Sequence, residues 1–362
     1  MSGQAEEFEK QAAEAVRQQE LEWLQKILNT SSSDKSEKSQ YELTERKGSG
    51  SYGVIYKAKD TLGEAGEVAI KCSFDEDEEE LSLSLEMKRE LSAFECLNVP
   101  GHENVLRSLN HIIREDERIT FIVMPYYPAG DLYDYLPTLK GMENEPRMQQ
   151  IQLWTGQLVR ALEYMHGKGL CHRDFKSGNI LVDKDQNRLI VCDFGLSRTN
   201  AKDAEGKKLR GSRARDMDGK FFSSVDVFTV PYRCPRFILS PKGNNPFSVD
   251  AWSLGCVVGD MIQGKTLFNA ENEVGVLHAH FGLLGTPTEE YWPGVTKFNR
   301  FKKWERDFPR VRLQPVEVAL KRYLGDMTAP VLAVLAQALV MNPVKRGSAA
   351  DLVNAFEREA AA

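Results

Sequence analysis

The chain has 362 residues, of which 41% are hydrophobic and 28% charged, and its formal net charge at pH 7 is −6. This composition is that of a globular protein, and the length allows one large two-lobed domain or two ordinary ones. The acidic balance gives no reason to expect a nucleic acid or an anionic membrane as a partner. No apolar run approaches the roughly 18 residues that a membrane-spanning helix needs, and the N-terminus lacks the apolar segment of a secretory signal.

Six cysteines are scattered through the sequence, at positions 72, 96, 171, 192, 234 and 256, and no CxxC pair suggests a zinc site. Cysteines without a regular spacing are typical of reduced thiols in an intracellular protein. We therefore expect the protein in the cytoplasm, the nucleus or both.

The first segment, residues 4–29, is rich in Glu, Gln and Ala. Apolar residues recur in it at helical spacing, at Leu21, Leu24, Ile27 and Leu28. This pattern predicts an amphipathic helix that docks on another surface. A Ser-rich stretch then predicts a flexible linker. We expect the helix and linker to occupy residues 1–40 and a folded domain to occupy residues 41–357.

A glycine-rich motif opens this domain. Gly48, Gly50 and Gly53 lie between two β-rich segments, residues 41–47 and 55–59. Glycines at these positions allow the backbone of a hairpin to approach phosphate groups without a clash of Cβ atoms. A Rossmann turn carries a similar motif, but there a helix follows the last glycine, whereas this sequence continues with strand-forming residues.

The most informative stretch is residues 171–179, Cys-His-Arg-Asp-Phe-Lys-Ser-Gly-Asn, which is followed by an Asp-Phe-Gly triplet at Asp193. Asp174 can accept or orient the proton of a substrate hydroxyl, and Lys176 can neutralise charge on a phosphate in transfer. Asn179 and Asp193 offer the hard oxygen ligands that Mg²⁺ prefers. The two motifs, in this order, resemble the catalytic loop and the metal-binding loop of the eukaryotic protein kinases.

The resemblance implies an α+β fold, the two-lobed protein kinase fold. A small β-rich N-lobe with one helix, αC, would span residues 41–124, a hinge residues 125–131, and a larger, mainly helical C-lobe residues 132–357. Lys176 is typical of Ser/Thr kinases, so the resemblance implies transfer of the ATP γ-phosphate to Ser or Thr of protein substrates. ATP and Mg²⁺ would be the cofactors.

The resemblance also assigns the site residues. Lys71 would hold the α- and β-phosphates and pair with Glu90 of αC, and both would support catalysis with Asp174 and Lys176. Asn179 and Asp193 would bind the metal. With Lys71, the residues implied to contact ATP are Lys47, Gly48, Gly50, Gly53, Ile55, Ala69, Met124, Pro125, Tyr127, Asp131 and Leu181.

The second half of the chain narrows the resemblance. The run Leu284-Gly285-Thr286-Pro287 is similar to the insert of the CMGC group of kinases and most similar to that of cyclin-dependent kinases. Mitogen-activated kinases are the nearby alternative, but Ser224-Val225-Asp226 lacks their Thr-x-Tyr. In the CMGC group an arginine that matches Arg233 favours proline after the phosphate acceptor, which implies Ser/Thr-Pro substrates.

Three features depart from the family. The activation segment, residues 193–236, has a basic excess around residues 199–220, which is either a solvated excursion or a docking site for an acidic partner. Arg236 replaces the glutamate of Ala-Pro-Glu, so Arg346, its expected partner, needs another acid or the lobe is less stable. Lys88 replaces an apolar cyclin contact. We therefore expect a regulatory protein other than a standard cyclin, bound to αC or to the N-terminal helix.

Phosphorylation is expected to regulate the kinase. Ser224 matches the activating threonine of cyclin-dependent kinases, and three arginines match those that bind its phosphate: Arg89, Arg173 and Arg198. Ser51 and Tyr52 match an inhibitory Thr-Tyr pair, where a phosphate would repel ATP; alternatively, the Tyr52 ring only caps the glycine loop.

Two alternatives to a protein kinase remain open. One is a pseudokinase or scaffold of the same fold, which only Arg236 supports. The other is a small-molecule kinase of related fold, which Lys176, the activation segment and the CMGC-like insert disfavour.

Overall fold

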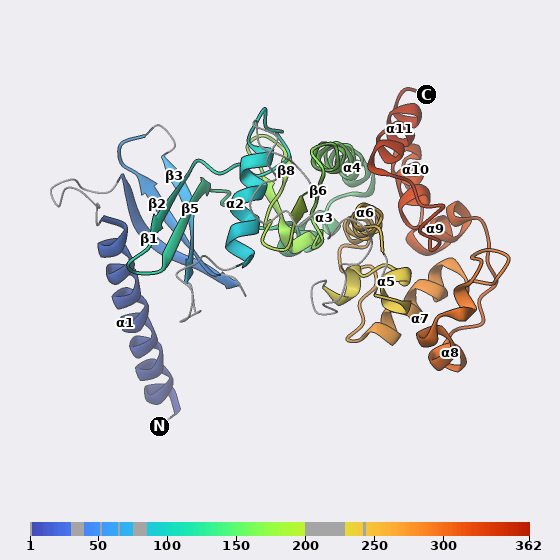
Figure 1. Cartoon of the computed structure of the whole chain (residues 1–362), viewed down its shortest axis with the longest axis horizontal. Helices are drawn as coiled ribbons and strands as arrows, with labels where there is room; N and C mark the ends of the chain where they lie inside the picture. Colours follow the sequence, from blue (N-terminus) through green and yellow to red (C-terminus); the bar gives the residue numbers. More distant parts are fainter. Residues whose placement is uncertain are drawn as a thin grey trace.

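The protein is described here from a computed structural model, in which residues 2–29, 40–50, 53–63, 66–74, 85–199, 229–241 and 244–362 are placed. The chain forms a β-sheet lobe that follows the N-terminal helix and a larger helical lobe that contains the C-terminus (Figure 1). The predicted α+β, two-lobed fold is confirmed. Within these ranges no helix is long and apolar enough to cross a membrane.

The N-lobe sheet has five antiparallel strands in the order β1-β2-β3-β5-β4. Side chains alternate between the two faces of a strand, and in β3 this places Ile70 on one face and Lys71 on the other. One helix packs against each face of the sheet, and parts of β1, β2 and β4 stay exposed. The strands are β1 (Tyr41–Gly50), β2 (Gly53–Asp60), β3 (Glu67–Phe74), β4 (Asn110–Arg114) and β5 (Ile119–Pro125).

The N-terminal helix α1 (Ser2–Asn29) covers the face that carries Ile70. Leu24, Ile27 and Leu28 are buried there in one apolar cluster with residues of all the strands except β4, whose Ile112 packs at its margin. The N-terminal end of the helix projects beyond the sheet (Figure 1). The surface on which the predicted amphipathic helix docks is thus the protein's own N-lobe.

A polar contact aligns α1 with the edge of the sheet. The side-chain amide of Gln25 donates to the carbonyl oxygen of Tyr41 over 3.0 Å, and its oxygen accepts the backbone N–H of Leu43 at 2.6 Å. Both backbone groups belong to β1, an edge strand. Gln25 therefore satisfies backbone groups that no neighbouring strand pairs.

Helix α2 (Leu85–Leu97), the expected αC, lies on the opposite face of the sheet. Its buried residues Met87, Phe94 and Leu97 belong to the main apolar cluster, which continues through Ile122 and Met124 of β5 into the C-lobe. The main core thus joins the two lobes, whereas the α1 cluster belongs to the N-lobe alone.

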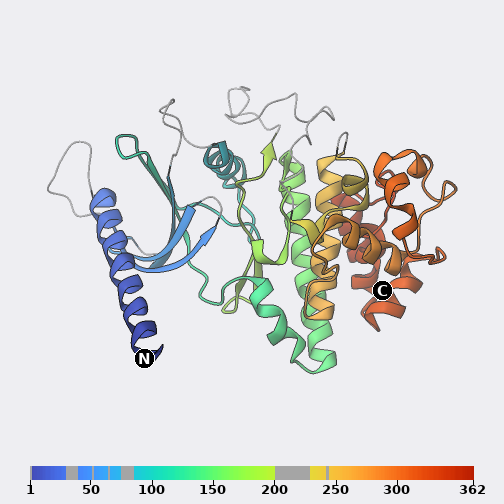
Figure 2. The ribbon, with the colours of Figure 1, turned by 90° about the horizontal axis from the view of Figure 1, so that it is seen from below.

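The C-lobe is built around α6 (Pro246–Gln263). Nearly every side chain of this helix is buried, because it is apolar on all sides. Helix α4 runs beside it (Figure 2). The other helices are α3 (Leu132–Lys140), α4 (Asn144–Gly167), α5 (Pro235–Leu239), α7 (Glu273–Leu284), α8 (Asn299–Trp304), α9 (Val316–Leu324), α10 (Ala329–Ala338) and α11 (Ala349–Ala360).

Two short two-stranded sheets lie between the lobes (Figure 1). Strands β7 (Ile180–Asp183) and β8 (Arg188–Val191) pair with each other, and β6 (Leu170–Cys171) pairs with β9 (Arg198–Thr199). The segment that connects β6 to β7 contains the predicted catalytic loop, and the segment from β8 to β9 contains Asp193. This arrangement brings the two motifs side by side.

Candidate active site

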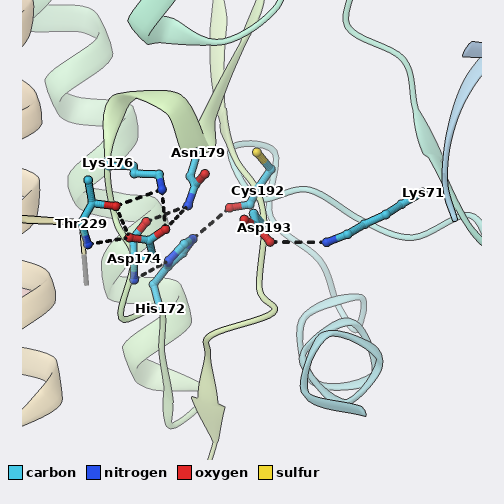
Figure 3. A network of polar contacts seen from close by, with 8 residues as sticks. All are labelled: Lys71, His172, Asp174, Lys176, Asn179, Cys192, Asp193 and Thr229. Carbon is cyan, nitrogen blue, oxygen red and sulfur yellow. Dashed lines mark hydrogen bonds and ion pairs between the residues drawn. The ribbon is translucent and has the colours of Figure 1, made fainter. Parts of the chain in front are cut away.

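Asp174 lies at the centre of a polar network (Figure 3). Its Oδ2 is 2.7 Å from the Nζ of Lys176 and accepts the Nδ2 of Asn179 at 3.0 Å. Its Oδ1 accepts the hydroxyl of Thr229 at 2.9 Å, and Lys176 donates to that same hydroxyl over 3.0 Å. The carboxylate is thus fixed in orientation by three neighbours, with only 8% of the residue exposed.

Lys71 is held between two carboxylates. Its Nζ lies 2.7 Å from Oε2 of Glu90 on α2 and 3.5 Å from Oδ1 of Asp193. Burial disfavours the charge on Lys71, but the carboxylates of Glu90 and Asp193 outweigh burial and raise the pKa of Lys71. Burial also disfavours the charge on Asp193, yet the ammonium of Lys71 lowers the pKa of Asp193. These shifts favour the charged forms of Lys71 and Asp193, which could position phosphate oxygens and a metal. Burial raises the pKa of Glu90, against the opposing effect of the Lys71 ammonium.

The backbone of the catalytic loop is anchored to α6. Asp250 accepts the N–H of His172 at 2.7 Å and the N–H of Arg173 at 2.8 Å. Arg173 and Asp193 have φ angles of 69° and 63°, in the left-handed region that residues other than glycine rarely adopt. The ring of His172 contacts the carbonyl oxygen of Cys192, with Nε2 at 2.9 Å, which links the two strained positions. These bonds stabilise a backbone shape that local preference disfavours.

The glycine motif forms the turn of the β1–β2 hairpin. Gly50 pairs with Gly53, and Gly48 with Ile55. Gly53 has a φ of 143°, and a Cβ atom there would lie 2.4 Å from the carbonyl oxygen of Cys72. Only glycine fits this position. Strand β2, rather than a helix, begins at this last glycine, so the hairpin predicted over the Rossmann alternative is confirmed. Ser51 and Tyr52 lie outside the described residues.

The residues expected around adenine and ribose lie where the lobes join. Ala69 of β3 is opposite Met124 of β5, which is 5% exposed, and Pro125 ends that strand. Asp131 begins α3, where its carboxylate accepts the N–H of Asp134, and it forms a backbone bridge with Leu181 of β7.

Two other predicted contacts flank this group. The carbonyl oxygen of Tyr127 accepts the N–H of Gly130 at 3.2 Å, which closes the turn after β5. Lys47 of β1 lies with its Nζ 5.8 Å from the centre of the Tyr126 ring. The structure thus brings the predicted ATP-contacting residues to the junction from strands β1, β2, β3, β5 and β7 and from the segment between β5 and α3.

Two residues of the site were not anticipated from the sequence. Thr229 bridges Asp174 and Lys176, and no sequence motif marks it. Asp260 of α6 is fully buried and accepts the hydroxyls of Ser177 at 2.6 Å and Tyr232 at 2.7 Å. Burial raises the pKa of Asp260 to about 6. A second acid, besides Asp250, inside a mostly apolar helix was the available signal for this residue.

The elements that carry the three predicted phosphate-binding arginines lie together. Arg198 of β9 is paired with Cys171 of β6, two residues before Arg173, and β9 lies against α2, which carries Arg89. Arg89 is 3.4 Å from Glu86, and Arg173 donates to the carbonyl oxygen of Leu196. Ser224 lies outside the described residues.

Arg346 is satisfied without an acid. Its guanidinium donates to the carbonyl oxygens of Ser248 at 2.7 Å and Val340 at 2.9 Å, and lies 5.1 Å from the centre of the Trp252 ring. The expected replacement acid is not found among the described residues. Arg236, which replaces the family's glutamate, instead stacks on the ring of Phe298 at 4.7 Å. Backbone carbonyls thus take the place of the carboxylate.

The sequence matches the protein kinase domain family over residues 41–356. The chain belongs to the protein kinase family. It is 30% identical over 328 residues to cyclin-dependent kinase C-2 of Oryza sativa subsp. japonica, an alignment that covers 87% of this chain and 58% of the rice protein. This kinase therefore spans less than two thirds of the length of that relative.

A solved structure shows the same fold. A chain of the CAK complex from Chaetomium thermophilum, bound to ATP-gamma-S, matches this kinase with a TM-score of 0.71 and 24% identity. The match covers 87% of this chain and 90% of the fungal one. The predicted similarity to cyclin-dependent kinases is confirmed by the rice relative.

Proposed function

We propose that this protein transfers the γ-phosphate of ATP to Ser or Thr hydroxyls of protein substrates. The observation that carries the proposal is the orientation of Asp174 by Lys176, Asn179 and Thr229, close to the ion group of Lys71, Glu90 and Asp193. Phosphoryl transfer depends mainly on such positioning and electrostatic stabilisation. Family membership supports the same conclusion.

In this proposal Asp174 orients the substrate hydroxyl and accepts its proton. Lys176, 2.7 Å from the carboxylate, neutralises charge that develops on the phosphate in transfer. The hydroxyl of Thr229 holds both groups at a fixed separation. Because Lys176 and Thr229 both contact Asp174, neither can move without changing the orientation of the base.

The donor set fits Mg²⁺ and ATP. The Nδ2 of Asn179 is used by Asp174, which leaves the amide oxygen of Asn179 for a metal, beside the ionised carboxylate of Asp193. No group of three or more His, Cys, Asp or Glu in the described ranges could hold a metal alone, so the ion would be shared with phosphate oxygens. Bound Mg²⁺ would neutralise charge on the phosphates.

The glycine hairpin and the lobe junction would hold the nucleotide. At Gly53 the backbone approaches β3 too closely for a Cβ atom, and such a flat hairpin turn can lie against phosphates. Lys71 would position the phosphates, with Glu90 fixing its reach. The remaining contacts to adenine and ribose would come from Lys47, Gly48, Gly50, Ile55, Ala69, Met124, Pro125, Tyr127, Asp131 and Leu181.

Substrates in which proline follows the phosphate acceptor are the proposed specificity. Arg233, 6% exposed, is fixed by an ion pair to Glu273 at 2.8 Å. A rigid Arg233 would hold the neighbouring backbone so that any P+1 residue other than proline leaves its N–H unpaired. A peptide library without enrichment of proline at P+1 would contradict this specificity.

Phosphorylation at Ser224 is the proposed activation step, since the elements that carry Arg89, Arg173 and Arg198 adjoin. A regulatory protein is proposed on α2 rather than on the buried half of α1, which the sheet already occupies. The fungal relative comes from a complex, which supports such a partner. Lys88 on α2 argues against a standard cyclin.

Transfer of labelled γ-phosphate to a generic protein substrate tests the function, with Asp174→Asn as the matched inactive variant. The wild-type protein should label Ser and Thr, and the variant should not. Nucleotide binding without transfer by the phosphorylated wild type would favour a pseudokinase. Labelling of small molecules but not of proteins would favour a small-molecule kinase.

A further inference from the structure

A strongly basic stretch lies in the C-lobe, within a chain whose net charge is −6. Residues 297–312 contain seven Lys or Arg but only two acids, Glu305 and Asp307. Six of the cations are exposed, and no ion pair joins them to any described carboxylate. One of the six, Lys297, acts on the charge of Glu289, which leaves five. We call these five the basic surface: Lys302, Lys303, Arg306, Arg310 and Arg312.

The first three cations point away from the core. Phe301 of α8 and the nearby Phe308 are buried against Phe281, with ring centres 6.4 and 4.8 Å from it. Lys302 and Lys303 directly follow Phe301 on α8, so their side chains leave the helix in directions other than that of the buried ring. Arg306 follows on the short 3-10 helix Glu305–Asp307 and is exposed as well.

The two arginines lie on an extended segment that α7 and its following loop hold. Thr286 donates its N–H to the carbonyl oxygen of Val311 over 2.9 Å, and its hydroxyl to that of Pro309. Gly285 has a φ of 90°, and a Cβ atom there would lie 2.7 Å from the Cα of Leu313. The Leu-Gly-Thr-Pro motif thus holds the 309–313 backbone through hydrogen bonds from Thr286 and close packing at Gly285.

Alternation along this segment exposes both arginines. Val311 and Leu313 are half-buried, whereas Arg310 and Arg312 are exposed, as expected when successive side chains of an extended chain point in opposite directions. The backbone that carries them is already ordered. Binding an anionic partner here would therefore cost less conformational entropy than binding at a mobile loop.

Ion pairs connect this region to the end of the activation segment. Arg300 of α8 donates to Glu273 over 2.8 Å and to the carbonyl oxygen of Ile238 over 2.7 Å. The other oxygen of Glu273 pairs with Arg233 at 2.8 Å. Arg233 follows Thr229, the residue that contacts Asp174, by four positions. The basic surface therefore lies on the part of the C-lobe that also fixes Arg233, the residue proposed to favour proline at P+1 of the substrate.

We propose that the basic surface binds an acidic segment of protein substrates, outside the residues that surround the phosphate acceptor. The proposal rests on the proposed kinase function. A short acidic segment would contact the basic surface alone, whereas a long polyanion or an anionic membrane would also meet the acidic remainder of the molecule. Local charge complementarity thus favours a protein segment over a nucleic acid or a lipid surface.

Binding can be measured without catalysis. The probe is a fluorescein-labelled 12-residue peptide of Glu and Gly, followed by fluorescence anisotropy at 50 mM NaCl. Two charge-reversal variants, Lys302→Glu/Lys303→Glu and Arg310→Glu/Arg312→Glu, should each weaken binding about tenfold. Lys59→Glu/Lys265→Glu changes the net charge equally at two exposed sites elsewhere and should leave binding unchanged. Binding should weaken as salt is raised.

Several results would overturn the proposal: no binding by the wild type, binding by either charge-reversal variant as tight as that of the wild type, or an equal loss in the control. Tighter binding of a labelled 12-nucleotide single-stranded DNA would assign the surface to nucleic acid instead.

A kinetic arm connects the surface to the reaction. Two Ser-Pro peptides are compared, one of which carries the acidic tail after a ten-residue Gly/Ser linker with an r.m.s. length of about 17 Å. The tail should lower KM about tenfold at unchanged kcat. This difference in KM should disappear in both charge-reversal variants and remain in the Lys59→Glu/Lys265→Glu control. Equal KM values for the two peptides would contradict a role in substrate binding. Phosphorylation of neither peptide would instead contradict the kinase function, and the anisotropy measurement would still test the surface.

Discussion

Arg114, on the edge strand β4, binds the C-terminal end of α1 through Leu28: its Nη2 donates to the Leu28 carbonyl oxygen over 3.0 Å. Its Nε donates to the preceding carbonyl, that of Ile27, at 3.1 Å. The last carbonyls of a helix have no partners within the helix and carry partial negative charge, so a guanidinium there is favourable. With Gln25 bonded to β1, the helix is attached to both edges of the sheet.

The docking of α1 predicts a stability effect at Leu24. This side chain is fully buried between α1 and the sheet, so Leu24→Ala should lower the free energy of unfolding by about 2–5 kcal/mol. Urea unfolding followed by circular dichroism measures the change. Val16 lies on the same helix and is 64% exposed; Val16→Ala should stay within about 0.5 kcal/mol. Equal stability of the two variants would mean that α1 does not support the N-lobe.

The ion pair of Lys71 and Glu90 predicts an effect on ATP use. Glu90→Gln removes the charge that fixes Lys71, so kcat/KM for ATP should fall on the order of 10²-fold. Steady-state assays with varied ATP measure it. Glu95 is exposed on the same helix, and Glu95→Gln should leave the value unchanged. Wild-type kinetics of Glu90→Gln would remove the pair from the proposed machinery.

Asp260 predicts a pH dependence. Burial raises its folded-state pKa to about 6, above the ordinary value of 3.8, so the folded protein binds this proton more tightly than the unfolded chain. The resulting stability is fully present below about pH 4 and is lost as the pH rises through 6. Asp260→Asn cannot titrate. The wild type should therefore lose stability relative to this variant between pH 4 and 6, by at most about 1.4 kcal/mol per pH unit.

Denaturant unfolding at four pH values across this window checks the prediction. Asp351, an exposed acid whose pKa is lowered by hydrogen bonds from Ser348, provides the comparison. Asp351→Asn should show almost no trend across this window, because the stability that the lowered pKa of Asp351 contributes is present above about pH 4 and is lost only as the pH falls below it. A stability difference for Asp260→Asn that is independent of pH would contradict the assignment of this titration.

The position of Ser224 predicts loss of activation in Ser224→Ala. A phosphate at Ser224 could form charge-assisted bonds to the three arginines, and the Ala variant cannot form them. Activity measured together with site-resolved mass spectrometry should show a phosphate at Ser224 in the active wild type. Ser223→Ala is the matched control and should remain active. Full activity of Ser224→Ala without phosphate at Ser223 would exclude this switch.

The carbonyl contacts of Arg346 predict a large cost for its removal. Arg346→Met would leave the half-buried carbonyls of Ser248 and Val340 without their donor, and each unsatisfied group costs up to about 1–3 kcal/mol. Thermal unfolding measures the loss. Arg236→Met, at the position of the missing glutamate, should cost less, because this half-buried side chain donates to the Ser240 carbonyl at the end of its own helix and stacks on Phe298. A larger cost at Arg236 would show that it is the structural residue of the two.

The sequence predicted the fold and the central network well, because both rest on local motifs. Catalytic-loop residues lie within nine positions of one another, so their spacing alone indicated shared chemistry. By contrast, Thr229 reaches Asp174 from 55 positions away, and only tertiary packing creates that contact. The partners of Arg346 were not predictable either, since backbone carbonyls leave no mark in a sequence.

The helical pattern of α1 illustrates the same limit. Leu24, Ile27 and Leu28 predicted a buried face, but periodicity describes one surface and says nothing of the surface that covers it. The identity of the partner depended on Gln25 and Arg114, whose polar side chains carry no periodic signal. Both join the helix to the sheet: Gln25 of α1 bonds the backbone of β1, and Arg114 of β4 bonds the last carbonyls of α1.

The bonding of Gln25 to β1 covers a strand edge that could otherwise pair with another chain. An open strand edge presents unpaired N–H and C=O groups that can recruit another chain into a continuous sheet. The Gln25 amide of α1 makes the hydrogen bonds at Tyr41 and Leu43 that a neighbouring strand would otherwise make. The apolar side chains of α1 cover the adjoining face of the sheet. Shortening the protein to its kinase domain would therefore uncover both a pairing edge and an apolar sheet face, the combination from which intermolecular β-aggregates grow.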